Sequence, residues 1–210
     1  MTRVFIVDDH AILRRGIRDI LSDGDSIEVV GEAQDYSELR AQMKSVTIDL
    51  LLLDINLPGK NGIDILKILH EENPRLKVLM LSMYAEDQYA VRALKAGAHG
   101  YLNKGSAPEL LLDAVRQIMS GKKFITPQIA QALADNLTRE DTETPHTRLS
   151  DREFQTLCLM ASGQRLADIA ETLALSPKTV SAYRARILEK MGMRNNAELT
   201  HYALKHALVE

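Results

Sequence analysis

Cysteine is almost absent from this sequence, because Cys158 is the only one in 210 residues. A single cysteine excludes a disulfide framework and a zinc site built from cysteines, and it is typical of a reducing compartment. Only 6 prolines and 11 glycines are present, which excludes collagen and extended disorder. No apolar run approaches the roughly 20 residues of a membrane helix, and no secretory signal pattern follows Met1. These absences predict a soluble, cytoplasmic protein without membrane contact.

Length and charge predict two domains. The 210 residues lie between one and two typical domains, and two small cores fit this length better than one. Residues 1–145 carry 17 Lys and Arg against 22 Asp and Glu, whereas residues 146–210 carry 9 against 7. An acidic front and a mildly basic back indicate different partners for the two halves.

The first 121 residues alternate apolar runs with helical patterns. The runs are residues 4–7, 27–33, 50–53, 78–81 and 100–102, and the helical segments are 11–22, 36–45, 62–71, 86–96 and 107–120. Four consecutive leucines, Leu50 to Leu53, suit a strand buried on both faces, as in a parallel sheet. Five strand–helix units in succession predict an open parallel α/β sheet with five helices.

A polar segment separates this region from a purely helical one. We predict a linker over residues 122–147, where residues 126–133 could form a short helix packed on either domain. From residue 148 to 210 we predict an all-helical domain of four helices. The first has a capping box of Ser150 and Glu153, and the third begins at Ser176 and Pro177.

Polar residues stand where four apolar runs of the front domain end. They are Asp8 and Asp9, then Asp54, then Ser82, and finally Lys104. Ligands of open parallel sheets bind outside the carboxyl ends of the strands. We therefore expect three carboxylates, a hydroxyl and an ammonium to meet at one edge. One such aspartate is usually a helix cap and one such lysine is usually surface, but four strand ends in register favour a functional site.

Three clustered carboxylates need a cation to remain ionised together, and oxygen ligands with an open face suit Mg²⁺. An aspartate beside such an ion can accept a phosphoryl group as an acyl phosphate. Lys104 can neutralise the incoming phosphoryl oxygens, and Ser82 can hydrogen-bond one of them. The residues alone thus predict a magnesium-dependent phosphoryl-transfer site.

Residues 1–121 resemble the receiver domain of a two-component response regulator, which has a flavodoxin-like fold. The matching motifs are VDDH at 7–10, LDINLPG at 53–59, LS at 81–82 and GYLNK at 100–104. The resemblance implies that Asp54 accepts a phosphoryl group from a sensor histidine kinase or phosphotransfer domain. It also implies that Asp9, Asp54 and the Asn56 backbone carbonyl ligate Mg²⁺, with Asp8 nearby or acting through water.

The resemblance assigns the switch residues as well. Lys104 and Ser82 contact the phosphoryl group, and Tyr101 is the aromatic residue that follows Ser82 on activation. Tyr101 could instead be ordinary core packing. Two residues depart from the commonest receiver pattern: Gly105 replaces a proline after Lys104, and bulky Met83 replaces a small residue.

The third helix of the back domain has the pattern of a DNA-recognition helix. A short turn before Ser176 gives helix-turn-helix spacing. Small or basic residues share the face opposite the apolar one, which allows close approach to base edges. The candidate DNA contacts are Lys178, Thr179, Ser181, Ala182 and Ala185, flanked by Arg184, Arg186 and Lys190. We expect Lys178 to contact bases and the last three to bind phosphates; a solvated surface helix is the alternative.

This back domain resembles the LuxR-type DNA-binding domain, and the whole chain is similar to response regulators of the NarL/FixJ type, nearest the GacA/UvrY branch. The resemblance implies a homodimer on double-stranded promoter DNA and regulation by phosphorylation, not an enzyme. Two rivals remain: an aspartate-based phosphatase, disfavoured because Asn56 stands where its acid/base aspartate belongs, and a binding module without phosphoryl chemistry. The six histidines, His10 among them, show no metal-ligand spacing.

Overall fold

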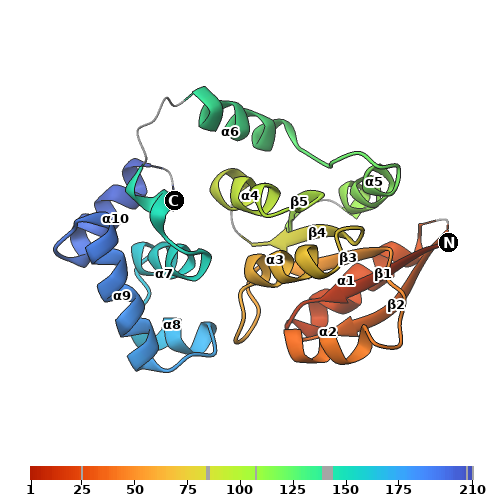
Figure 1. The fold of residues 1–210 in the computed structure, drawn as a ribbon, viewed down its shortest axis with the longest axis horizontal. Coiled ribbons are helices and arrows are strands. Elements are labelled where there is room, and N and C mark those ends of the chain that lie inside the picture. The colour runs from red at the N-terminus through yellow and green to blue at the C-terminus, as the bar shows by residue number, and fades with distance from the viewer. Residues whose placement is uncertain (25, 84–85, 107, 139–143, 207, 210) are drawn as a thin grey trace. The chain divides into compact units, whose positions relative to one another are not determined.

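The structure, a computed structural model, describes residues 1–210 except residues 25, 84–85, 107, 139–143, 207 and 210. The chain divides into two units, residues 1–138 and 139–210 (Figure 1). In the described part of the chain, no helix combines the length and apolar character that a membrane crossing needs.

A parallel sheet of five strands, counted over the described residues, organises the first unit. Its strands are β1 (Thr2–Val7), β2 (Ile27–Ala33), β3 (Leu50–Asp54), β4 (Lys77–Ser82) and β5 (Gly100–Asn103), in the order β2-β1-β3-β4-β5. All neighbouring strands run parallel. The sheet confirms the predicted fold, and it places the carboxyl ends of β1, β3, β4 and β5 next to one another.

Helices cover both faces of this sheet. On one face, α1 (Ala11–Ser22) and α5 (Pro108–Met119) bury residues such as Leu21 and Ile118 against alternate strand residues such as Ile6 and Leu52. Because side chains alternate along a strand, the intervening residues, Tyr101 among them, point to the opposite face. That face belongs to α2 (Tyr36–Gln42), α3 (Gly62–Glu72) and α4 (Glu86–Lys95).

The central strand β3 is fully enclosed, as its leucine run predicts. Leu50 to Leu53 have no exposed surface, and Asp54 is 1% exposed. Helix α3 begins directly behind the end of this strand, where the Gly62 N–H donates to the Ile55 carbonyl oxygen at 2.8 Å. A Cβ atom on Gly62 would lie 2.1 Å from the Asp54 carbonyl oxygen. Only glycine therefore allows α3 to approach the end of β3 this closely.

The chain that follows α5 remains attached to the first unit. The Phe124 N–H donates to the His99 carbonyl oxygen at 2.9 Å, and Phe124 pairs with Gly100 beside β5. Helix α6 (Pro127–Thr138) then packs against α4, with Ile129 fully buried. The helix that the sequence suggested over residues 126–133 thus continues to Thr138. Within the predicted linker 122–147, residues 139–143 lie outside the described residues.

The second unit is helical throughout its described residues. It contains the short turn η1 (Pro145–Arg148) and the helices α7 (Asp151–Ala161), α8 (Leu166–Thr172), α9 (Pro177–Met191) and α10 (Asn196–Lys205). Helix α7 packs against the other three helices. The capping box of Ser150 and Glu153 is present at its start. This arrangement confirms the predicted four-helix domain, in which α8 and α9 form the helix-turn-helix.

Candidate functional site

Charged side chains from three strand ends meet in the first unit, as the sequence predicts. The Lys104 ammonium follows β5 and lies 2.6 Å from Asp8 Oδ2 and 2.8 Å from Asp54 Oδ2. The Lys104 N–H donates to the Ser82 carbonyl oxygen at 2.7 Å, which fixes the chain after β5 against the end of β4. One buried lysine therefore bridges the carboxylates at the ends of β1 and β3.

Burial controls the acidity of Asp54. Loss of hydration raises the pKa of its carboxyl from 3.8 to about 6, and the nearby charge of Asp8 acts in the same direction. The positive charge of Lys104 opposes this rise. The carboxylate consequently stays mostly ionised above pH 6 while it is more basic than an exposed aspartate, which suits a nucleophile.

The donor set at this edge fits a hard divalent cation. Asp8, Asp9, His10 and Asp54 each offer one ligand atom, and these atoms lie within 4.8 Å of one another. Opposite oxygens around octahedral Mg²⁺ lie about 4 Å apart, so small side-chain movements suffice. Asp54 Oδ1 is buried and accepts no hydrogen bond of normal geometry from the described residues. A buried acceptor in this position is the kind of atom that a cation or a phosphoryl group completes.

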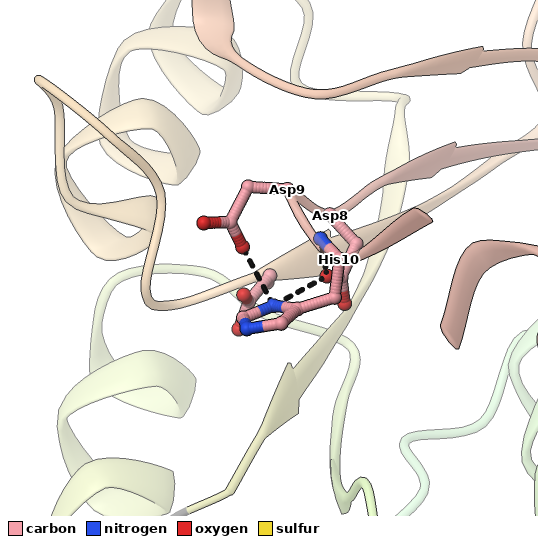
Figure 2. A group of neighbouring side chains, drawn as sticks. Asp8, Asp9 and His10 are labelled. Carbon is pink, nitrogen blue, oxygen red and sulfur yellow. Dashed lines mark hydrogen bonds and ion pairs between the residues drawn. The ribbon is translucent and has the colours of Figure 1, made fainter. Parts of the chain in front are cut away.

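Sequence reasoning missed two residues at this site. It set His10 aside, yet Figure 2 shows the imidazole lying against the carboxylates of Asp8 and Asp9. It also gave no role to Arg14, whose guanidinium donates to the Asp8 backbone carbonyl and lies 3.4 Å from Glu32. The usable signal for both was position: His10 directly follows the acidic pair, and Arg14 is one helical turn later.

Two of the predicted switch residues, Ser82 and Tyr101, lie inside the protein. Ser82 and Tyr101 have no exposed surface, so Tyr101 is in an inward orientation. Met83, which replaces a small residue of the commonest receiver pattern, is 67% exposed. The described residues contain no cis peptide bond, so the bond between Lys104 and Gly105 is trans. The Gly105 N–H donates to Asn103 Oδ1 at 2.8 Å, which fixes this loop without proline.

Helix α9 of the second unit sorts its residues largely as predicted. Ser176 Oγ accepts the Thr179 N–H at 3.1 Å and caps the helix, and Ala174 in the preceding turn has a φ of 50°. Val180, Ile187 and Met191 are buried, whereas Tyr183 is only half-buried. The predicted outward face is exposed over Lys178, Ser181, Ala182, Ala185 and Arg186.

Two of the predicted phosphate-binding groups have partners within the second unit. Lys190 Nζ lies 2.6 Å from Glu153 Oε2, the carboxylate that also completes the α7 capping box. Arg184 Nε donates to Asn196 Oδ1 at 2.6 Å, at the start of α10. These contacts brace α9 against α7 and α10, so both side chains have a structural task besides any contact with DNA.

Comparison with protein families assigns both parts of the chain. Residues 4–116 match the response regulator receiver domain, and residues 147–203 match the bacterial regulatory proteins of the luxR family. The response regulator UvrY of Escherichia coli K12 is 38% identical over 209 residues, which cover 99% of this chain and 96% of UvrY. The response regulator GacA of Pseudomonas protegens is 36% identical over 210 residues, covering 100% and 99%.

Solved structures of the response regulator RcsB from Salmonella typhimurium are similar to this chain over both of its parts. One shares 28% sequence identity and a TM-score of 0.60, covering 99% of this chain and 98% of RcsB. A second shows RcsB from Salmonella enterica serovar Typhimurium bound to the promoter rprA with the phosphomimetic BeF₃⁻, at 29% identity and a TM-score of 0.59 over 96% and 98% of the two chains. The chain therefore belongs to the two-component response regulators that join a receiver domain to a LuxR-type DNA-binding domain.

Proposed function

We propose that Asp54 is the phosphoacceptor of this regulator. The observation that carries the proposal is the Lys104 bridge between two buried carboxylates at adjacent strand ends. In the transfer, an Asp54 carboxylate oxygen attacks the phosphorus of a phosphohistidine on a sensor kinase or phosphotransfer domain. A P–O bond forms as the P–N bond breaks, and the imidazole leaves with its electron pair and takes up a proton.

Three residues act around this step. Lys104 moves from the two carboxylates to the negative oxygens of the bound phosphoryl group, because these oxygens carry more charge. The Ser82 hydroxyl donates to one of those oxygens, and Tyr101 follows Ser82 on the inner face of β5. Ser82 and Tyr101 are fully buried, and α4 packs against β5, which carries Tyr101. A movement of these side chains toward the phosphoryl group therefore has to alter the packing toward α4.

We further propose that the acidic edge holds Mg²⁺ through Asp9, Asp54 and the Asn56 backbone carbonyl, with Asp8 nearby or acting through water. The buried Asp54 Oδ1, which accepts no normal hydrogen bond from the described residues, supports this assignment. When bound, the ion supplies charge neutralisation for the carboxylates and the phosphoryl oxygens. The Asp9 side chain is partly exposed, so it would hold the ion at the side of the site that is open to water.

For the second unit we propose recognition of promoter DNA as a homodimer, with α9 in the major groove. Lys178, Ser181, Ala182 and Ala185 form an exposed face of α9, and the small side chains of the last three allow this face to approach base edges closely. The structures of RcsB bound to a promoter and of RcsB dimers bound to DNA support DNA binding as a dimer here. Thr179, Arg184, Arg186 and Lys190 complete the proposed contact set. We keep residues 1–121, 122–147 and 148–210 as the proposed receiver, linker and DNA-binding segments.

The test of the phosphoacceptor uses intact mass after incubation with acetyl phosphate and Mg²⁺. The wild-type protein should gain the mass of one phosphoryl group, and Asp54→Asn should gain none. Asp19→Asn, an exposed aspartate on α1, is the matched control and should be labelled as the wild type is. Labelling of Asp54→Asn at the wild-type level would remove the assignment. Loss of labelling in EDTA tests the metal, and Asp9→Ala should raise the Mg²⁺ concentration needed.

A further inference from the structure

The side chain of His10 bridges the two carboxylates of the acidic pair. His10 Nδ1 lies 2.7 Å from Asp9 Oδ1 and 3.2 Å from Asp8 Oδ1 (Figure 2). The His10 backbone N–H donates to the same Asp8 oxygen at 2.8 Å. His10 occupies the N-cap position of α1, but its side chain makes no capping hydrogen bond. The imidazole is thus turned away from the helix and toward the acidic pair.

The partners of Nδ1 identify it as a donor. An ionised carboxylate oxygen only accepts hydrogen bonds, so the nitrogen between two of them carries the hydrogen. A nitrogen that donates in this way has no lone pair available for a metal ion. Mg²⁺ also prefers oxygen ligands at 2.0–2.1 Å, whereas imidazole suits transition metals. In this orientation His10 is therefore not a magnesium ligand.

The imidazole and a cation need the same oxygens. Asp8 Oδ1 and Asp9 Oδ1 are turned toward His10 Nδ1, and Asp8 Oδ2 is turned toward Lys104, so a cation that uses the oxygens facing His10 displaces at least one of the two imidazole contacts. Two of the side chains that contact these carboxylates, Lys104 and His10, differ in their freedom to move. The Lys104 side chain is 2% exposed, whereas the His10 side chain is 64% exposed. His10 can rotate into solvent without disturbing the core.

We propose that His10 is an affinity-determining residue that closes the metal site and has to swing outward before a divalent cation binds. This inference rests on the proposed magnesium site. It adds a residue that opposes the cation to the residues that bind it. The energy of the two imidazole contacts is lost when the cation enters, so His10 weakens cation affinity and raises the Mg²⁺ concentration at which the receiver becomes competent for phosphoryl transfer.

Calorimetric titration of the full-length protein with MgCl₂ and with MnCl₂ tests the proposal. A partly exposed hydrogen bond of this kind corresponds to about a 3- to 10-fold change in an equilibrium constant. His10→Ala should therefore bind both ions about 3- to 10-fold more tightly than the wild type. His70→Ala, an exposed histidine on α3, is the control and should leave both affinities unchanged.

The two ions separate the closing role from a ligand role. If His10 were a ligand, His10→Ala would bind Mn²⁺ more weakly than wild type does, and the loss of affinity would be larger for Mn²⁺ than for Mg²⁺. That result would overturn the proposal. Equal affinity of His10→Ala and wild type also overturns it. A second measurement follows the His10 ring by ¹⁵N NMR: the hydrogen-bonded Nδ1–H signal seen in EDTA should disappear as Mg²⁺ saturates.

Failure of the underlying magnesium site is recognised separately. Asp9→Ala should bind Mg²⁺ more weakly than wild type whatever the role of His10. If Asp9→Ala and wild type bind Mg²⁺ alike, the proposed site is wrong and the role of His10 falls with it. If Asp9→Ala loses affinity while His10→Ala does not gain it, only the closing role is wrong.

Discussion

Replacement of Asp54, the proposed phosphoacceptor, should stabilise the metal-free protein. In Asp54→Asn a neutral amide of nearly the same shape takes the place of a carboxylate that is 1% exposed. Burial raises the pKa of that carboxyl from 3.8 to about 6, after the opposing attraction of Lys104 has been included. The ionised side chain is therefore less favourable in the folded receiver than in the unfolded chain, and the amide avoids this cost.

The magnitude follows from proton linkage. A rise of about two pKa units corresponds to about 3 kcal/mol. Between pH 3.8 and about 6 the native state retains a proton that the unfolded state has released, so stability falls as pH rises through this window. Above this pH window the buried carboxylate of Asp54 lowers the free energy of unfolding by the full amount. We expect the free energy of unfolding of Asp54→Asn to exceed that of wild type by about 3 kcal/mol at pH 7.5, and by only a small fraction of this at pH 4.

Native-state hydrogen exchange in EDTA measures this difference within the receiver alone. The amides of β1 and β3 report the opening free energy of the sheet once intrinsic exchange rates at each pH are corrected. Asp19→Asn serves as the control, because its exposed side chain should give no pH-dependent gain. Equal protection of Asp54→Asn and wild type at pH 7.5, or the same gap at pH 4 and pH 7.5, would refute the reasoning. Saturating Mg²⁺ should narrow the gap by stabilising wild type.

Four further substitutions test the packing and the DNA-binding unit. Gly62→Ala should lower stability by about 1–3 kcal/mol and reduce acetyl phosphate labelling, because its Cβ meets a β3 carbonyl oxygen; an unchanged melting temperature contradicts this. Arg186→Ala should reduce the salt slope of DNA binding by about 1 in mobility shifts. Lys190→Ala should reduce the salt slope less than Arg186→Ala does, because the Lys190 ammonium pairs with Glu153. Equal reductions by the two variants would contradict this role of the ion pair. Ser150→Ala should lower the free energy of unfolding by about 1 kcal/mol, measured by thermal unfolding. An unchanged melting temperature would show that the α7 cap does not contribute to stability.

The sheet and the acidic edge were predictable because each depends on local sequence. The leucine run from Leu50 to Leu53 identifies a strand buried on both faces, and parallel topology then brings the ends of the strands together. The polar residues Asp54 and Lys104 immediately follow such runs, so their convergence follows from the fold. The structure confirms this fold and places these charges in contact.

Side-chain partners across the fold were less accessible to sequence reasoning. His10 shows no ligand spacing because its contacts arise from a turn between β1 and α1. Lys190 falls on the basic flank of α9 by helical spacing, yet Glu153 is 37 residues away in the chain. Periodicity assigns a residue to a face but does not identify what the facing element carries. The DNA contacts themselves stay predictions for the same reason.

The attachment of Phe124 and α6 to the receiver determines where this chain can be cut or grafted. A fragment ending at residue 121 would lose a phenylalanine from the core, worth about 1.5–3 kcal/mol, and its hydrogen bond to the His99 carbonyl. It would also strip α6 from α4 and expose the neighbours of the buried Ile129. A fragment that carries the proposed receiver segment, residues 1–121, should therefore extend to Thr138, and a foreign output domain joined there would leave α6 packed on α4.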